Sequence, residues 1–173
     1  MFQGELVGIF LAREKGGACE RVEAAVLHAG RGLEGDRYFL GARGSGPALP
    51  PGGREVTLFE AEVLEALLAE GGPALDGADT RRNLLTRGVP LNHLVGQVFQ
   101  VGAARLRGVM LCEPCTRLDK LAGQKLIRPL LHRGGAARGG AAGGRHRIRR
   151  RDRSDPAPVS WAANVRGSNV ASL

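Results

Sequence analysis

The stretch Glu55-Val-Thr-Leu-Phe-Glu-Ala-Glu-Val-Leu-Glu-Ala-Leu-Leu-Ala-Glu70 changes its hydrophobic pattern partway along. Residues 55–59 alternate in the manner of a strand. From Glu60 the apolar residues recur at helical spacing, and the run stops at Gly71 and Gly72, which favour a helix end. A strand therefore leads directly into a helix, so the sequence predicts a domain that contains both kinds of element.

Short apolar runs on both sides of this stretch predict further strands. We expect strands at residues 6–12, 25–27, 80–86, 97–101 and 104–111, and further helices at 115–122 and 124–133. Short strands thus predominate over helices. The predicted fold is β-rich α+β, a small β-barrel with a few peripheral helices.

The composition limits the class of protein. The 173 residues suit one domain, and a hydrophobic content of 43% is enough to build a core. Aromatic residues make up only 4%, which leaves few stacking platforms for single-stranded nucleic acid. No apolar run approaches the roughly 18 residues of a membrane span, and residues 1–15 lack the features of a signal peptide. We therefore expect a soluble cytoplasmic protein that does not associate with membranes.

The net charge of +8 is concentrated near the C-terminus. Residues 133–153 hold eight arginines and one acid, whereas the rest of the chain carries 17 basic and 16 acidic residues. From Gly134 the sequence is mostly Gly, Ala and Arg, a composition that buries little apolar surface. This pattern divides the chain into a domain at residues 1–133 and a low-complexity, disordered basic tail at residues 134–173.

The pair Cys112-Glu-Pro-Cys115 is the most reactive-looking motif. A zinc site would need further ligands, such as His93 or His132, and their spacing fits no zinc-finger pattern. The remaining interpretations are a thioredoxin-like redox pair, two ordinary cysteines, and a thiolate that binds a soft metal such as molybdenum or accepts sulfur. Cys19 lies in a polar loop and is expected to be inert.

Two further motifs carry guanidinium groups. Arg81-Arg82-Asn83 falls in a predicted strand, where alternation would place Asn83 on the same face as Arg81 and direct one arginine inward. An inward arginine suits a phosphate or carboxylate, and the alternative is a solvated or ion-paired arginine pair. The second motif is Gly35-Asp36-Arg37-Tyr38. Asp36 is expected to order a turn through backbone hydrogen bonds, and Arg37 is a candidate for an anionic site.

Taken together and in order, these motifs resemble the MOSC domain, named after the C-terminal domain of molybdenum cofactor sulfurase. The matching segments are GLEGDRY (32–38), REVTL (54–58), RRNLLTRG (81–88), LVGQVFQVG (94–102) and LCEPCTRL (111–118), and the resemblance covers about residues 4–135. It implies a β-barrel-type fold and either binding of the pterin molybdenum cofactor or transfer of sulfur on a cysteine. Standalone bacterial members are similar to molybdenum-dependent reductases of N-hydroxylated bases, and pyridoxal phosphate binding is a further association of the family.

The resemblance also assigns roles to residues. Cys115 matches the family cysteine and would be the catalytic thiolate, as metal ligand or sulfur carrier. Tyr38 replaces a histidine often found at its position. A reductase would need an electron-donor partner, and a sulfur carrier would need an external cysteine desulfurase. The residues implied to bind or shape the cofactor site are Arg81, Arg82, Asn83, Asp36 and Arg37.

The chain departs from the family pattern at about residue 134. A one-base change of reading frame near residues 133–136 would turn the Gly/Ala/Arg codons into the usual family ending, and the closing strands would then be missing from this chain. The alternative is a native Arg/Gly-rich tail that binds RNA or another polyanion without catalysis. Neither a P-loop nor the nucleophile motif of esterases nor a dinucleotide fingerprint occurs in the sequence.

Overall fold

The computed structural model describes residues 2–41, 55–133, 137–141, 144–149 and 158–161. Its strands are β1 (Phe2–Leu11), β2 (Glu20–Val22), β3 (Ala24–His28), β4 (Gly32–Leu33), β5 (Val56–Glu60), β6 (Leu84–Arg87), β7 (Val98–Val101), β8 (Ala104–Leu111), β9 (Ala137–Ala141), β10 (Arg145–Arg149) and β11 (Pro158–Trp161). Its helices are α1 (Ala61–Ala69), α2 (Thr116–Ala122), α3 (Ile127–Leu130) and the 3-10 helix η1 (Leu91–Leu94). The β-rich α+β fold predicted from the sequence is confirmed.

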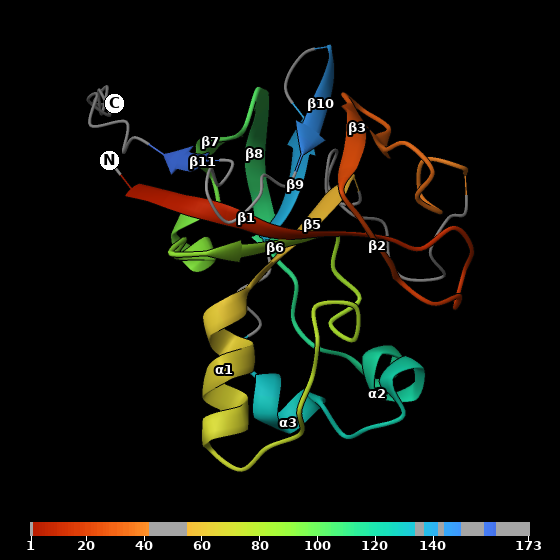
Figure 1. The fold of residues 1–173 in the computed structure, drawn as a ribbon, viewed down its shortest axis with the longest axis vertical. Helices are drawn as coiled ribbons and strands as arrows, with labels where there is room; N and C mark the ends of the chain where they lie inside the picture. Colours follow the sequence, from red (N-terminus) through yellow and green to blue (C-terminus); the bar gives the residue numbers. More distant parts are fainter. Residues whose placement is uncertain (1, 42–54, 134–136, 142–143, 150–157, 162–173) are drawn as a thin grey trace, which may run out of the picture.

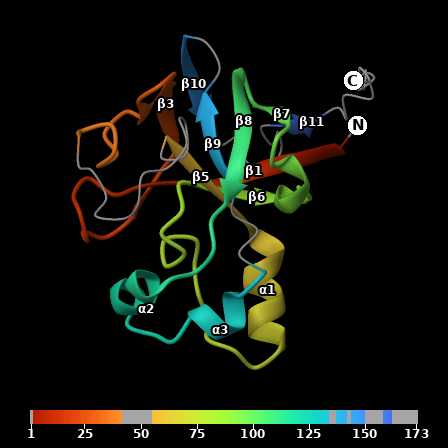
Figure 2. The same cartoon turned by 180° about the vertical axis from the view of Figure 1, so that it is seen from behind.

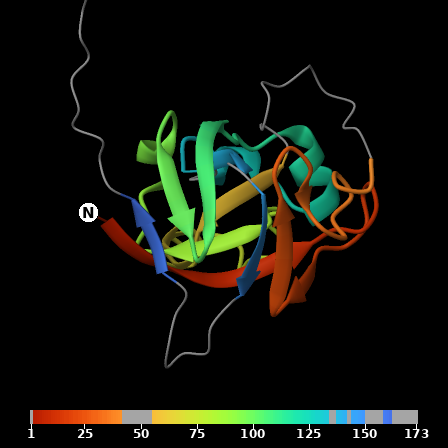
Figure 3. The same cartoon turned by 90° about the horizontal axis from the view of Figure 1, so that it is seen from above.

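The main sheet is curled into a barrel-like form (Figures 1 and 3). Its strand order is β11-β7-β8-β9-β5-β6-β1-β2, and β11 also pairs with β1, so the sheet meets itself at that seam. A smaller sheet of order β10-β3-β4 lies beside it. The chain leaves β5 directly for α1, as the change of pattern at Glu60 predicts.

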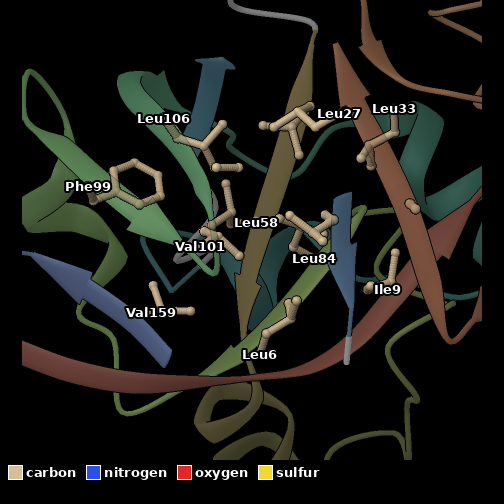
Figure 4. Close-up of a cluster of buried hydrophobic side chains, with 14 of the residues drawn as sticks. Leu6, Ile9, Leu27, Leu33, Leu58, Leu84, Phe99, Val101, Leu106 and Val159 are labelled. Carbon is tan, nitrogen blue, oxygen red and sulfur yellow. The ribbon is translucent and has the colours of Figure 1, made fainter. Parts of the chain in front are cut away.

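The core of the barrel is aliphatic and follows from the alternation of side chains along each strand. In β8, Ala104 and Leu106 point inward while Arg105 and Arg107 are exposed. Figure 4 shows leucines, isoleucine, valines and Phe99 converging from strands all round the sheet. Burial of these side chains is the main stabilising contribution to the barrel.

A second apolar cluster lies beneath the barrel, where the three α-helices gather at one end of the sheet (Figures 1 and 2). Its buried members are Phe59, Leu67, Cys112, Leu118, Leu126 and Leu130. Phe59 of β5 connects this cluster to the sheet. Cys112, the residue after β8, packs in the same cluster. None of the helices within the described ranges is long and apolar enough to cross a bilayer.

Two predicted elements are shorter in the structure. The strand expected at residues 80–86 begins only at Leu84, because Thr80 and Arg81 form a turn in which Arg81 has a φ of 61°. The helix expected at residues 124–133 is limited to Ile127–Leu130. At the start of α3, the backbone N–H groups of Leu126 and Ile127 donate hydrogen bonds to the carboxylate of Asp119, at 2.7 and 3.0 Å.

At residues 137–141, 144–149 and 158–161 the structure differs from the prediction of a disordered tail without closing strands, and the rest of the predicted tail lies outside the described residues. Strand β9 pairs with β8 and β5, β10 pairs with β3, and β11 pairs with β1 and β7. Composition was misleading here because pairing uses backbone groups, and two apolar side chains, Ile148 and Val159, suffice to face the core. The proposed change of reading frame itself is a statement about the gene, and the fold does not test it.

Candidate functional site

Asn83 joins three parts of the barrel through its buried side chain. Its Nδ2 donates to the carbonyl of Phe10 in β1 and to Oδ2 of Asp36, both at 3.2 Å. Its Oδ1 accepts hydrogen bonds from the backbone N–H of Thr57 in β5, at 3.1 Å, and from the Thr57 hydroxyl, at 2.9 Å. The side chain of Asn83 therefore connects β1, β5 and the loop after β4, and its amide group is hydrogen-bonded to protein groups.

Asp36 is the second buried member of this network. Its carboxylate accepts hydrogen bonds from the backbone N–H of Ala12 at 3.2 Å and of Tyr38 at 3.1 Å, besides the one from Asn83. The bond to Tyr38 is the local turn contact expected from the sequence. The bond to Ala12 fastens the loop after β4 to the end of β1, so Asp36 positions the residue that follows it, Arg37.

Arg37 lies beside this network. Its backbone N–H donates to the carbonyl of Ala12 at 2.7 Å, and its Nη1 lies 3.9 Å from Asp36 Oδ2. The guanidinium carbon lies 4.4 Å from the ring centroid of Tyr38, so the tyrosine supports the side chain from one face. Tyr38 thus has an identifiable role in holding an arginine.

Arg81 and Arg82 occupy the turn before β6, and strand alternation does not apply to them. Arg82 Nη2 donates to the carbonyl of Cys112 at 3.1 Å, which joins the turn to the segment that follows β8. The Nε atoms of both arginines are buried and have no hydrogen-bond partner within the part of the chain that the structure describes. Such unsatisfied cationic donors are costly, and an anion would satisfy them.

The three arginines act on a common group, the thiol of Cys19. Burial raises the pKa of its thiol, and the positive charges of Arg81, Arg37 and Arg82 each act to lower it, while Asp36 acts to raise it. All three guanidinium groups therefore lie within electrostatic range of one thiol. We call Arg37, Arg81 and Arg82 the arginine cluster. The expectation of a single inward arginine assumed a strand, whereas Arg81 lies in a turn before β6.

Sequence reasoning missed Cys19 as a member of this site. In the sequence it stands in a polar, glycine-containing loop, and the nearest arginine, Arg21, is not one of the arginine cluster. Its proximity to the cluster arises only when the loop between β1 and β2 folds back beside the turn before β6. No local pattern carries that signal.

The two cysteines of the Cys112–Cys115 motif have different environments. Cys112 is buried in the helical cluster, with an exposed fraction of 3%, whereas Cys115 is exposed immediately before α2. Neither cysteine forms a disulfide bond. No three His, Cys, Asp or Glu side chains in the described ranges are grouped as metal ligands. Cys115 is therefore the thiol of the motif that a ligand in solution reaches.

These residues lie on segments that meet on one side of the barrel. Figure 1 shows the β1–β2 connection, the loop after β4, the turn before β6 and the segment leading to α2 on the side of the molecule that carries α2. A barrel-like sheet thus presents an arginine cluster, one half-buried thiol and one exposed thiol. Guanidinium groups are donors for anions and thiolates are ligands for soft metals, so the arrangement offers both kinds of donor.

Comparison with known proteins identifies the family of this domain. The family model for the MOSC domain matches residues 27–145, and the chain belongs to the MOSC domain family. No curated protein sequence matches the chain. The likeness to solved structures concerns the fold.

Three crystal structures illustrate that likeness. The YuaD protein of Bacillus subtilis superposes with a TM-score of 0.70 at 16% identity, over 92% of this chain and 96% of YuaD. YiiM of Geobacillus stearothermophilus gives 0.64 at 12% identity, over 90% and 73%. YiiM of Escherichia coli gives 0.63 at 17% identity, over 94% and 71%.

Proposed function

We propose that this protein binds the pterin molybdenum cofactor, with the arginine cluster on the cofactor phosphate and Cys115 as the thiolate. The observation that carries the proposal is the pair of buried Nε atoms of Arg81 and Arg82, which have no hydrogen-bond partner among the described residues. Arg37 contributes a third positive charge that acts, like theirs, on the Cys19 thiol. A phosphate is the simplest group that satisfies several guanidinium donors at once. Membership of the MOSC family supports the choice of cofactor.

The donor set fits this cofactor in its chemistry. Thiolates are soft ligands and suit molybdenum, and Cys115 is an exposed thiol of the conspicuous motif. Asp36 and Asn83 contribute by holding the two arginine-bearing loops, because their side chains are occupied by Ala12, Phe10 and Thr57. When bound, the cofactor would supply a redox-active metal or a site for sulfur.

The reaction class depends on whether a partner protein supplies electrons or sulfur. As part of a molybdenum-dependent reductase of N-hydroxylated compounds, the domain would receive electrons from a separate donor protein. As a sulfur carrier, Cys115 would receive a persulfide from an external cysteine desulfurase. The exposure of Cys115 suits both, because either partner must approach it from solvent.

Native mass spectrometry of the chain mixed with released molybdenum cofactor tests the proposal. We expect a complex whose protein component has the mass of the 18.2 kDa chain. If protein expressed from the gene has a mass different from 18.2 kDa, the difference supports the change of reading frame. Arg81→Gln and Arg82→Gln should lose the complex, whereas Arg105→Gln, an exposed arginine of β8, should retain it.

Cysteine variants separate the roles of the two thiols. Cys115→Ser should lose the metal while the pterin phosphate is still bound by the arginines, and Cys112→Ala should alter stability without abolishing binding. If Cys112 is required as much as Cys115, a two-cysteine redox or metal site replaces the proposal. A correctly folded chain that binds no cofactor would move the function to sulfur transfer through Cys115.

A polyanion-binding function is the second candidate, and one observation favours it. Arg145, Arg147 and Arg149 are exposed along β10, where they alternate with His146 and the buried Ile148. Binding of RNA through these arginines would weaken steeply as salt rises, because counterions are released on neutralising phosphates. Replacing the three by glutamine would abolish that binding and leave binding of the cofactor unchanged.

A further inference from the structure

Arg82 makes a direct contact with the segment that leads to Cys115. Its Nη2 donates a hydrogen bond of 3.1 Å to the carbonyl oxygen of Cys112, the residue after β8. The bond joins the turn before β6 to the segment that runs from β8 to α2 (Figure 2). Cys115 is the last residue of that segment before the helix. The arginine-bearing turn and the exposed thiol are thus connected through Arg82.

The backbone around Arg82 is fixed on both sides. Its N–H donates to the hydroxyl of Thr80 at 3.2 Å, and this buried hydroxyl donates in turn to the carbonyl of Gly77 at 2.7 Å. On the other side, the N–H of Asn83 donates to the carbonyl of Thr57 in β5 at 3.0 Å. The guanidinium group therefore extends from a firmly held part of the chain.

The segment that carries Cys115 is anchored at both ends. Cys112 is buried in the second apolar cluster, and so is Leu118 in the first turn of α2, whose N–H donates to the carbonyl of Cys115 at 2.8 Å. Glu113 and Pro114 lie between the two cysteines, and proline restricts both its own backbone and that of the residue before it. The position of the Cys112 carbonyl therefore largely determines where the Cys115 thiol stands.

Arg82 retains a donor for a ligand. Its side chain is only partly buried, but the Nε atom itself is buried and has no hydrogen-bond partner among the described residues. A guanidinium group is planar and holds its N–H donors in a fixed fork. An anion bound at Nε consequently fixes the orientation of Nη2, which holds the Cys112 carbonyl.

We propose that Arg82 is a positioning residue for Cys115: an anion at the arginine cluster orients the Arg82 guanidinium and, through the Cys112 carbonyl, holds residues 112–115 in one place. The proposal rests on the proposed function, because the anion is the one that the arginine cluster binds there. It adds an order to binding. The phosphate end of the ligand docks first, and this fixes the thiolate that meets the rest of the ligand.

This coupling has a thermodynamic consequence. If phosphate binds more tightly when the bond between Arg82 and Cys112 is formed, bound phosphate must make local opening of residues 112–118 rarer by the same factor. Coupling between two sites typically amounts to about fivefold or more. We therefore expect saturating inorganic phosphate to slow amide hydrogen exchange in residues 112–118 by about fivefold.

Hydrogen exchange of the full chain, followed by mass spectrometry with and without inorganic phosphate, measures this protection. A peptide that covers β7 is the internal control and should exchange at the same rate in both samples. Calorimetry under the same conditions reports whether phosphate binds. If phosphate binds without protecting residues 112–118, Arg82 does not position Cys115 and the proposed function stands alone. If phosphate does not bind, both proposals fall.

Lysine variants separate the guanidinium fork from its charge. Arg82→Lys keeps a positive charge that attracts phosphate, so phosphate should still bind but no longer protect residues 112–118. Arg81→Lys is the matched control, because the Nε of Arg81 is also buried and the bond to the Cys112 carbonyl comes from Arg82. With this variant the protection should remain at saturating phosphate. Equal protection in both variants would contradict the proposal.

Pro114→Gly tests the transmission to Cys115 without changing an arginine, and it decides the matter if Arg82→Lys fails to fold or to bind phosphate. Glycine removes the backbone restriction between the two cysteines. Phosphate should therefore still bind, while its protection of residues 115–118 should fall toward none. Undiminished protection in Pro114→Gly would show that the position of Cys115 does not depend on the Cys112 carbonyl.

Discussion

At the scale of the residue, Asn83 determines how the arginine-bearing turn meets the barrel. Asn83→Ala would remove its bonds to Phe10, Thr57 and Asp36 and leave buried polar groups of these residues without a partner. We expect a loss of about 2 to 4 kcal/mol in the free energy of unfolding. Urea denaturation measures it, with the exposed Asn92→Ala as control, for which less than about 0.5 kcal/mol is expected. Equal stability of the two variants would contradict the structural role of Asn83.

Glu60 supplies a pH-dependent prediction at the same scale. Burial raises its pKa above the ordinary value of 4.5, against the lowering effect of the hydrogen bond from the Leu91 N–H. The protonated form therefore suits the fold better, and its stabilising contribution is complete below pH 4.5 and is lost as the pH rises through the raised pKa of the folded protein.

Glu60→Gln keeps a neutral side chain and an acceptor for Leu91 at every pH. Its stability relative to the parent should therefore increase between pH 4 and pH 7, roughly by the amount that ionisation of Glu60 costs. Urea unfolding at several pH values measures the difference, with the exposed Glu14→Gln as control. A difference that stays constant with pH would show that Glu60 ionises normally in the fold.

At the scale of the element, the contact between β8 and η1 depends on a missing side chain. A Cβ atom at Gly108 would lie 2.0 Å from the carbonyl oxygen of Leu94 and 2.7 Å from its carbon, and both are backbone atoms. Gly108→Ala should therefore separate β8 from η1 and reduce stability by about 2 to 3 kcal/mol.

Gly102 provides the matched control. It lies in the turn between β7 and β8 with a φ of 58°, and a Cβ there would meet nothing within 4 Å. Gly102→Ala should cost only the backbone strain of a left-handed residue, about 1 kcal/mol. Thermal unfolding of the two variants compares steric contact with strain, and a smaller effect at Gly108 would contradict the close approach.

At the scale of the whole molecule, the barrel depends on strands from the last quarter of the chain. Ile148 of β10 and Val159 of β11 are buried in the aliphatic core, with exposed fractions of 1% and 2%. Ile148→Ala should lower stability by about 2 to 4 kcal/mol, whereas Arg147→Ala, exposed on the same strand, should change it little. Chemical denaturation distinguishes the structure from a disordered tail, for which both variants would equal the parent.

Local sequence patterns predict many of the strands and helices. The alternation of residues 55–59 and the helical spacing after Glu60 produce β5 and α1, and the apolar run 104–111 produces β8. These predictions succeeded because strand and helix periods depend on neighbouring residues alone. The resemblance of five short motifs to the MOSC domain likewise required only their order along the chain.

The tertiary structure decided what the local patterns left open. The turn at Arg81, with its φ of 61°, precedes the strand that was expected to include it. The folding of the β1–β2 loop brought Cys19 to a place where three arginines from two other loops act electrostatically on its thiol. It also paired β9, β10 and β11 with strands made much earlier in the chain, although their composition predicts no structure. Such contacts join residues distant in sequence, so their energy appears only when the chain is folded. Local patterns were thus enough for most of the elements before residue 112 and for the family, whereas the candidate site and the C-terminal strands depend on contacts between distant residues.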